Sequence, residues 1–159
     1  RHGLTHFYQG KKTYLKENYK MPAKTYTVGP GKLVFGATGS TKEVSCQVSS
    51  CVVSWDVEQG DKANLLCGET EFGASDYSAT LKATLFQDLA EANSFVAWTW
   101  TNKGTVQPVE FVPSTAADKA ITGSVVINPM DVGGDAKTKP TADIEYAFQG
   151  EPVLGDATP

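Results

Sequence analysis

Alternation of apolar and polar side chains with a period of two dominates the chain from about residue 25 onward. The clearest case is YSATLKATL at residues 77–85, where Tyr, Ala and Leu alternate with Ser, Thr and Lys. Because successive side chains of a β-strand point to opposite faces, this pattern predicts a half-buried strand. The same alternation in EVSCQVSSCVVSWDV (43–57) and ADIEYAFQG (142–150) predicts two more strands.

One segment departs from this pattern. In FQDLAEANS at residues 86–94, the spacing of Phe86, Leu89, Ala90 and Asn93 predicts a short helix. Such a short helix is marginal in water, so we expect it to pack on a sheet. Strand alternation returns in FVAWTWTN (95–102), with Val96, Trp98 and Trp100 expected on one face.

The remaining apolar runs are short and separated by Gly and Pro. They are TYTVGPGKLVFG (25–36), with a Gly-Pro-Gly turn, VQPVEFVP (106–113) and GSVVINP (123–129). In total we expect seven to nine strands and one helix, which predicts a mainly β fold: an antiparallel β-sandwich or partial barrel with one short flanking α-helix.

The length of 159 residues suits one domain. We place this domain at residues 21–153, after an N-terminal extension or arm (1–20) that ends before Met21-Pro22. Residues 154–159 are expected to form a C-terminal tail, frayed or acting as a linker.

The formal net charge of −4 is unevenly distributed along the chain. Residues 1–20 carry +4, and the rest therefore carries −8. Protein groups that hold nucleic acid by its phosphates are Lys and Arg, so an acidic body is unsuited to gripping DNA or RNA.

Cysteine and histidine give no metal site. Cys46, Cys51 and Cys67 form no C-x-x-C, and the two histidines, His2 and His6, lie far from them in the sequence. We expect buried free thiols, as in a protein made in a reducing cytosol, and no cofactor. No apolar run reaches the length of a membrane span, so we expect no membrane binding.

Acidic side chains at alternate strand positions are the main candidates for a functional site. Asp143 and Glu145 share one face of their predicted strand, opposite Ile144, and Asp56 and Glu58 are similarly patterned. A general acid and base would need a cleft, whereas a solvated sheet face explains the alternation without one. DVGGDAKTK (131–139) has too few carboxylates for a calcium loop and reads as a turn. We therefore expect neither an enzyme nor a metal site.

Five segments taken in order carry a family resemblance. They are MPAKTYTVGPGKLVFGATGS (21–40), SCQVSSCVVSWDVEQGDKANLLCGE (45–69), YSATLKATLFQDL (77–89), NKGTVQPVEFVPST (102–115) and GSVVINPMDVGGDAKTKPTADIEYAFQGEP (123–152). Together the series resembles the major tail protein, or tail tube protein, of long-tailed bacteriophages over residues 21–153.

The resemblance implies a virion structural subunit. Six copies would form a ring, each would contribute strands to an inner barrel, and rings would stack into a tube that conducts genomic DNA during ejection. It implies other tail proteins at the tube ends, transient non-specific passage of duplex DNA, assembly in the host cytoplasm and a place in the virion tail. An acidic wall would not hold the passing phosphates, which makes Asp143, Glu145, Asp56 and Glu58 candidates for the lumen.

Two other hypotheses remain open. Trp55, Trp98 and Trp100 suit a carbohydrate- or surface-binding β-sandwich module of a virion tail or decoration protein, although Trp98 and Trp100 also read as core or subunit interface. A glycan hydrolase would use Asp143 and Glu145 as paired carboxylates. We also expect residues 58–75, or residues 1–24, to become ordered only against a neighbouring ring.

Overall fold

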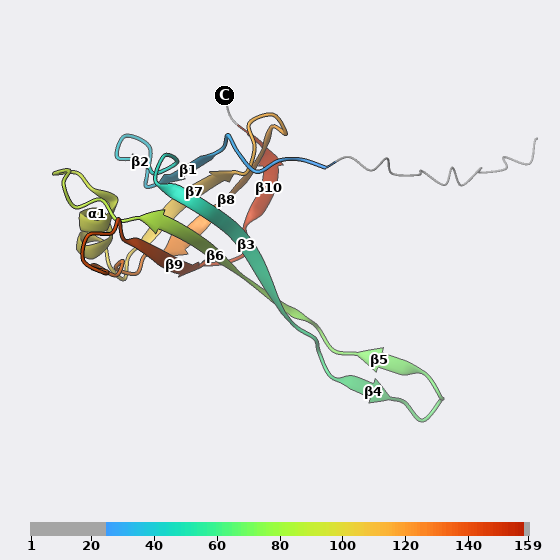
Figure 1. Ribbon diagram of the computed structural model, residues 1–159. Helices are drawn as coiled ribbons and strands as arrows, with labels where there is room; N and C mark the ends of the chain where they lie inside the picture. Colours follow the sequence, from blue (N-terminus) through green and yellow to red (C-terminus); the bar gives the residue numbers. More distant parts are fainter. Residues whose placement is uncertain (1–24, 158–159) are drawn as a thin grey trace, which may run out of the picture.

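The computed structural model describes residues 25–157, which form ten strands and one helix (Figure 1). The elements are β1 (Lys32–Phe35), β2 (Lys42–Glu43), β3 (Val48–Glu58), β4 (Lys62–Asn64), β5 (Thr70–Phe72), β6 (Asp76–Phe86), α1 (Phe95–Thr101), β7 (Val106–Val112), β8 (Lys119–Val126), β9 (Thr141–Ala147) and β10 (Val153–Asp156). All strand pairs are antiparallel.

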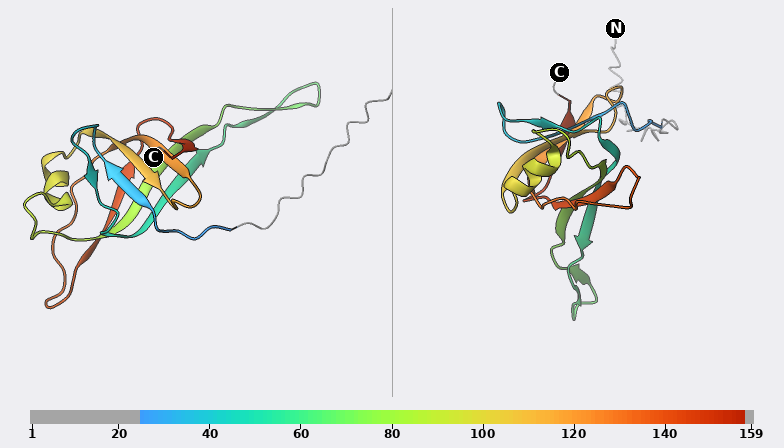
Figure 2. Two further views of the ribbon diagram at one scale, coloured as in Figure 1. Left: turned by 90° about the horizontal axis from the view of Figure 1, so that it is seen from above. Right: turned by 60° about the vertical axis from the view of Figure 1, so that its left-hand side comes forward.

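Two sheets pack face to face around the core. One has the strand order β10-β8-β7-β1-β2 and the other β3-β6-β9, with α1 at one end of the sandwich (Figures 1 and 2). A single bridge between Val125 and Phe148 links the sheets at one side, and they do not close into a barrel. The predicted antiparallel sandwich with one short helix is confirmed.

The core follows directly from the alternation in the sequence. In β9 the side chains at Ala142, Ile144 and Tyr146 are buried, and those between them are exposed. In β6 Ala79, Leu81, Ala83 and Leu85 are buried in the same way. These two strands lie side by side and meet Leu33 and Phe35 of β1 from the opposite sheet. Within β6 and β9 the expectation fails only at Tyr77, which is 54% exposed.

The helix lies one segment later than predicted, so the helix at 86–94 and the strand at 95–102 are both wrong. The Ser94 side chain caps α1 by accepting a hydrogen bond from the Ala97 N–H (3.2 Å), and Phe95, Val96 and Thr99 are buried. These three positions share one helical face, whereas the alternation of Val96 with the two tryptophans suggested a strand. The helical period holds here because it buries Phe95, Val96 and Thr99 against the sheets.

Both tryptophans of α1 contact other parts of the chain. The Trp98 ring stacks on Phe95 with centroids 5.6 Å apart and lies 6.1 Å from Phe35. Trp100 is 55% exposed, and its Nε1 donates to the Met130 carbonyl (2.8 Å). Trp98 therefore belongs to the core, while Trp100 lies on the surface.

Other boundaries differ from the expectations. Residues 153–156 form β10, which pairs with β8, so the sandwich includes part of the expected tail. The segment 58–75, for which no strand was predicted, contains the β4–β5 hairpin. Strands of two to four residues raise the number to ten. Residues 1–20 and Met21 lie outside the described residues.

The Tyr146 phenol gives a prediction about alkaline pH. Its Oη donates to the Asn128 carbonyl (2.9 Å), and burial raises the pKa of Tyr146. Since the folded state favours the neutral phenol, this stabilisation is complete below the unfolded pKa of about 10 and is lost as the pH rises above it. We expect Tyr146→Phe to cost about 1 kcal/mol at pH 7 and to lose stability less steeply than the wild type between pH 9 and 11.

Urea unfolding across this pH range checks the expectation. Tyr77→Phe, at an exposed position, serves as the matched control and should follow the wild type. If the free energy of unfolding falls equally steeply with pH in Tyr146→Phe and in the wild type, burial does not perturb the titration of this phenol.

Candidate assembly surfaces

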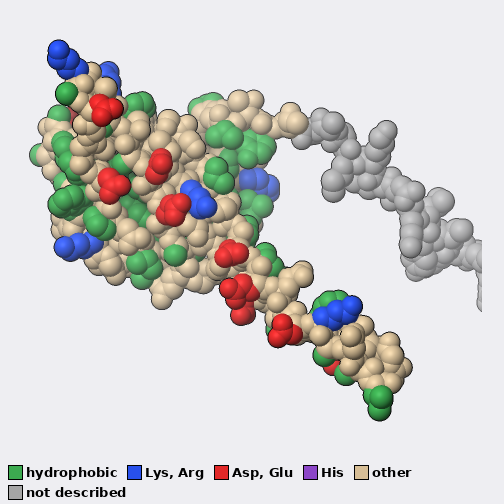
Figure 3. Space-filling model, turned by 60° about the horizontal axis from the view of Figure 1, so that its bottom comes forward, with side chains coloured by type: hydrophobic (Ala, Val, Ile, Leu, Met, Phe, Trp, Pro, Cys, Tyr) green, Lys and Arg blue, Asp and Glu red, His purple; other side chains and the backbone are tan. Residues whose placement is uncertain are grey.

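The outer face of the β3-β6-β9 sheet is strongly acidic. We define the acidic face by five carboxylates and one lysine: Asp56, Glu58, Asp76, Asp143, Glu145 and Lys82. All six side chains are exposed, and together they carry a formal charge of −4. Figure 3 shows Asp and Glu side chains following this sheet from the body onto the hairpin beyond it.

Strand register explains why these residues share a face. Lys82 of β6 pairs with Val52 on one side and Glu145 on the other, and Asp143 pairs with Thr84 two positions along. The Thr84 Oγ1 donates to Asp143 Oδ1 (2.6 Å). Side chains two apart on a strand point the same way, which places Asp143 and Glu145 together.

The other two predicted candidates lie on the same face, farther toward the hairpin. Asp56 pairs with Ser78, and Glu58 pairs with Asp76. The structure thus brings all four predicted residues onto one surface. Asp76 was missed, although its position two residues before Ser78 continues the polar face of β6. Asp143, Glu145 and Lys82 line a hollow of about 390 Å³ on this sheet face.

A two-stranded arm extends from this sheet. We call residues 59–75 the arm; it carries β4 and β5 and projects away from the body (Figure 1). Every residue of β4 and β5 is exposed. An isolated two-stranded hairpin is marginally stable in water, so this arm has the character of a contact element.

The end of the arm is apolar. At the turn Leu66 is fully exposed and Leu65 is 42% exposed. Phe72, which is 69% exposed, pairs with Lys62 at the other end of the hairpin. The turn is closed by hydrogen bonds from the Leu65 N–H to the Glu69 carbonyl (2.8 Å) and from the Gly68 N–H to the Leu65 carbonyl (3.0 Å). Gly68 has a φ of 88°, which glycine adopts without strain. The turn therefore holds leucine side chains in solvent.

A second apolar surface lies at the root of the arm. Trp55, Val57 and Tyr77 are each about half exposed on the face opposite the acidic one, and Glu151 borders them. They continue the core face of β3 and β6 beyond the part that contacts the other sheet. We call these three residues the root patch.

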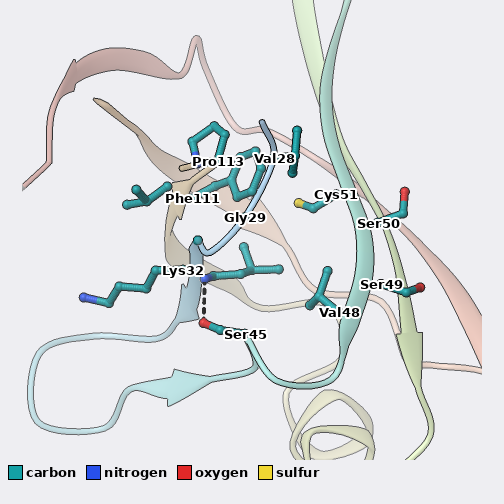
Figure 4. Close-up of a pocket in the computed structure, with 13 residues that line it drawn as sticks. Val28, Gly29, Lys32, Ser45, Val48, Ser49, Ser50, Cys51, Phe111 and Pro113 are labelled. Atoms are coloured by element: carbon teal, nitrogen blue, oxygen red, sulfur yellow. Dashed lines mark hydrogen bonds between the residues drawn. The ribbon is translucent and has the colours of Figure 1, made fainter. Parts of the chain in front are cut away.

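A small cavity of about 150 Å³ lies between β1 and β3, and Cys51 lines it (Figure 4). Its other walls include Val28, Val48 and Phe111, and the Leu33 N–H donates to Ser45 Oγ (3.0 Å) at its edge. Burial raises the pKa of the Cys51 thiol to about 12, so this thiol stays protonated at neutral pH.

The three cysteines are free, and two of them contradict the expectation of burial. Cys46 and Cys67 are exposed, and Cys51 is partly buried. Cys46 lies in the connection before β3 and Cys67 in the arm turn, where no sheet covers them. Within residues 25–157 no group of His, Cys, Asp and Glu is placed to hold a metal ion. No helix in this range has the length and apolar character to span a membrane.

Comparison with known proteins finds relatives in structure. No family model matches the sequence, and no curated protein matches it. A chain from the virion of a native gene transfer agent (GTA) particle has a TM-score of 0.56 at 16% identity, covering 77% of this chain and 95% of that one. A chain from the tail of an empty GTA particle with C6 symmetry gives the same TM-score and identity, covering 79% and 96%.

This protein and those chains share a fold. The match covers nearly the whole of each neighbour, so it concerns a complete domain and not a common hairpin. At 16% identity the likeness is one of fold alone, and the assignment of function is a separate step.

Proposed function

We propose that this protein is a structural subunit of a phage tail tube, in which hexameric rings stack into a hollow tube that conducts genomic DNA. The observation that carries the proposal is the fold shared with a chain from a C6-symmetric tail. The ordered sequence resemblance to tail tube proteins rests on the amino-acid sequence alone and supports the same function. The protein has no catalytic role in this proposal.

The acidic face supplies the wall of the tube. A charge of −4 per copy, repeated six times around a lumen, repels the phosphates of DNA. Fields of this kind act over about 8–10 Å at physiological salt, so they reach into a channel rather than across a whole particle. A lining with many Lys or Arg would instead bind phosphates and slow the DNA.

Free strand edges supply the contact between neighbours in a ring. In the described residues β3 and β9 each pair along one side with β6 and carry no strand ladder on the other side. Pairing β3 of one copy with β9 of the next would satisfy both edges in a head-to-tail ring. Six three-stranded sheets give 18 strands, and at about 4.8 Å per strand the ring is roughly 27 Å across before tilt widens it.

The arm supplies the contact between successive rings. It extends beyond the body and ends in exposed leucines, as a surface that another copy covers in the assembled tube. Other tail proteins would bind the tube ends, in a virion assembled in the host cytoplasm. Duplex DNA would pass without a specific site.

Electron microscopy of the purified protein and of particles tests the function. We expect stacked six-fold rings with a central channel. Two results together would contradict the proposal: purified protein that stays monomeric at high concentration, and particles whose tails do not contain this chain.

Charge reversal tests the acidic wall. We expect the double variant Asp143→Lys, Glu145→Lys to assemble as the wild type does, because both side chains are exposed. Its tubes should retain duplex DNA in a salt-dependent way, with affinity falling at least tenfold between 50 and 200 mM salt.

The isosteric variant Asp143→Asn, Glu145→Gln is the matched control and should retain far less DNA. DNA retention equal to that of wild-type tubes in the lysine variant would place these residues outside the lumen. Loss of polysaccharide turnover in the isosteric variant would instead favour a glycan hydrolase.

Exposed tryptophans support a second candidate, a carbohydrate- or surface-binding module. Trp55 is 48% exposed beside Tyr77 in the root patch, and Trp100 is 55% exposed. Aromatic faces of this kind can stack on sugar rings. A glycan array separates the candidates. A carbohydrate-binding module should give a binding signal that Trp55→Ala removes, whereas a tube subunit should give no such signal.

A further inference from the structure

Resting on the proposed function, we propose that the arm tip of one copy docks in a groove at the opposite end of the β3–β6 hairpin of a second copy. The tip consists of Leu65, Leu66 and Cys67. The receiving groove has a volume of about 460 Å³ and is lined by Cys46, Gln47, Phe86, Gln87, Thr138, Lys139 and Pro140.

The tip is a preformed apolar projection. Its turn is closed by two backbone hydrogen bonds, so little conformational freedom remains to be lost when it binds. Leu66, fully exposed, is the side chain with most to gain from burial. Burial of these leucine side chains in a groove would remove apolar area from water, which favours association.

The groove is also preformed. It lies where β3 begins and β6 ends, and Phe86 contributes an apolar wall that is 45% exposed. Gln87 fixes the opposite wall: its side chain bonds the Gly133 carbonyl (3.1 Å) and the Gly133 N–H (2.9 Å). The Gln87 N–H also donates to the Pro140 carbonyl (3.0 Å). These bonds hold the 131–140 loop beside the strand ends.

Charge favours this groove over the root patch as the receiving surface. Glu69 and Glu71 follow the tip, and Lys139 is the one charged residue among those that line the groove. The root patch is bordered by Glu151, which would repel the same arm. Asp88 lies near the groove, where its carboxylate accepts a hydrogen bond from Gln47 Nε2 (3.0 Å) and remains negatively charged, but it is not among the lining residues.

The placement at opposite ends gives a repeating contact. The arm leaves the C-terminal end of β3, and the groove adjoins its N-terminal end. From Glu58 to Leu66 an extended chain reaches at most roughly 26 Å beyond the sheet at about 3.3 Å per residue. A tip-to-groove contact joins two different surfaces, so copies can continue it along a stack without closing.

Cross-linking of Cys67 to Cys46 tests the docking. Assembled protein is treated with a short bismaleimide, which reacts with two exposed thiols, and the products are separated under denaturing conditions. We expect wild-type tubes to give dimers and longer chains, because every copy carries both thiols. Cys46→Ser and Cys67→Ser should each give no product alone, whereas tubes formed from both variants together should give dimers only. The variant that carries both Cys46→Ser and Cys67→Ser measures any background cross-linking through Cys51.

A charge swap gives a second measurement. We expect Lys139→Glu to raise the concentration needed for assembly at least tenfold, and Glu69→Lys, Glu71→Lys in the same chain to restore it. Cross-linked dimers in Cys46→Ser alone would mean that tip meets tip and would overturn the docking.

Rings and tubes without any Cys46–Cys67 product would overturn the docking and leave the tube function standing. Absence of rings under all conditions would overturn the tube function itself, and the docking with it.

Discussion

Shortening the arm should abolish tube formation without unfolding the subunit. The variant replaces residues 61–72 by Asn-Gly between Gly60 and Gly73, a dipeptide that closes two-residue hairpins. These two glycines already pack closely, since a Cβ on Gly60 would lie 2.3 Å from the Gly73 carbonyl carbon. Every side chain of β4 and β5 is exposed, so the core loses nothing.

The measurements are thermal unfolding of the isolated subunit and microscopy of the assembly. We expect the melting temperature to change by no more than about 2 °C, because the variant removes only exposed residues. Tubes should be absent even at tenfold higher protein concentration. Normal tubes from the shortened protein would exclude the arm as the contact between rings.

Replacing Phe35 by Ala should give the largest loss of stability. Phe35 is completely buried, and its ring lies 5.1 Å from Phe95 and 5.9 Å from Tyr146, centroid to centroid. Its removal leaves a cavity between the two sheets and α1. Such a change costs about 3–5 kcal/mol, a large part of the 5–15 kcal/mol by which most domains are stable.

Urea unfolding of the subunit checks this value. Phe72→Ala is the matched control, since it deletes the same side chain from an exposed position on the arm and should cost less than about 0.5 kcal/mol. A loss below 1 kcal/mol in Phe35→Ala would mean that the core around α1 is not packed as described.

The sequence predicted the long strands well because their burial follows a local rule. In β6 and β9 every second side chain enters the core, and the period of two is visible without knowledge of the partner strand. The misplaced helix shows the limit of that rule. Val96, Trp98 and Trp100 alternate along the chain, yet contacts with β1 and the Ser94 cap select a helix. The contacts with β1 are tertiary, whereas the Ser94 cap joins residues only three apart.

The candidate site was predicted in part for the same reason. Asp56 and Glu58, and Asp143 and Glu145, could each be placed on one face of a strand from spacing alone. That the two pairs share a surface depends on both β3 and β9 pairing with β6, which joins residues about 90 apart in the chain. The strands of the arm were not predicted, because they are only three residues long and show too little alternation.

The continuity of β3 and β6 with the arm has a mechanical consequence for the proposed tube. The same two stretches of backbone form the channel wall and then the coupling to the next ring: the ladder runs unbroken from Ser50 to Glu58, stops, and resumes at Lys62 in the arm. A rotation imposed on one ring would therefore be transmitted through the arm to the channel lining of the neighbouring ring. The bending stiffness of the tube would then depend on the stiffness of β3, β6 and the arm.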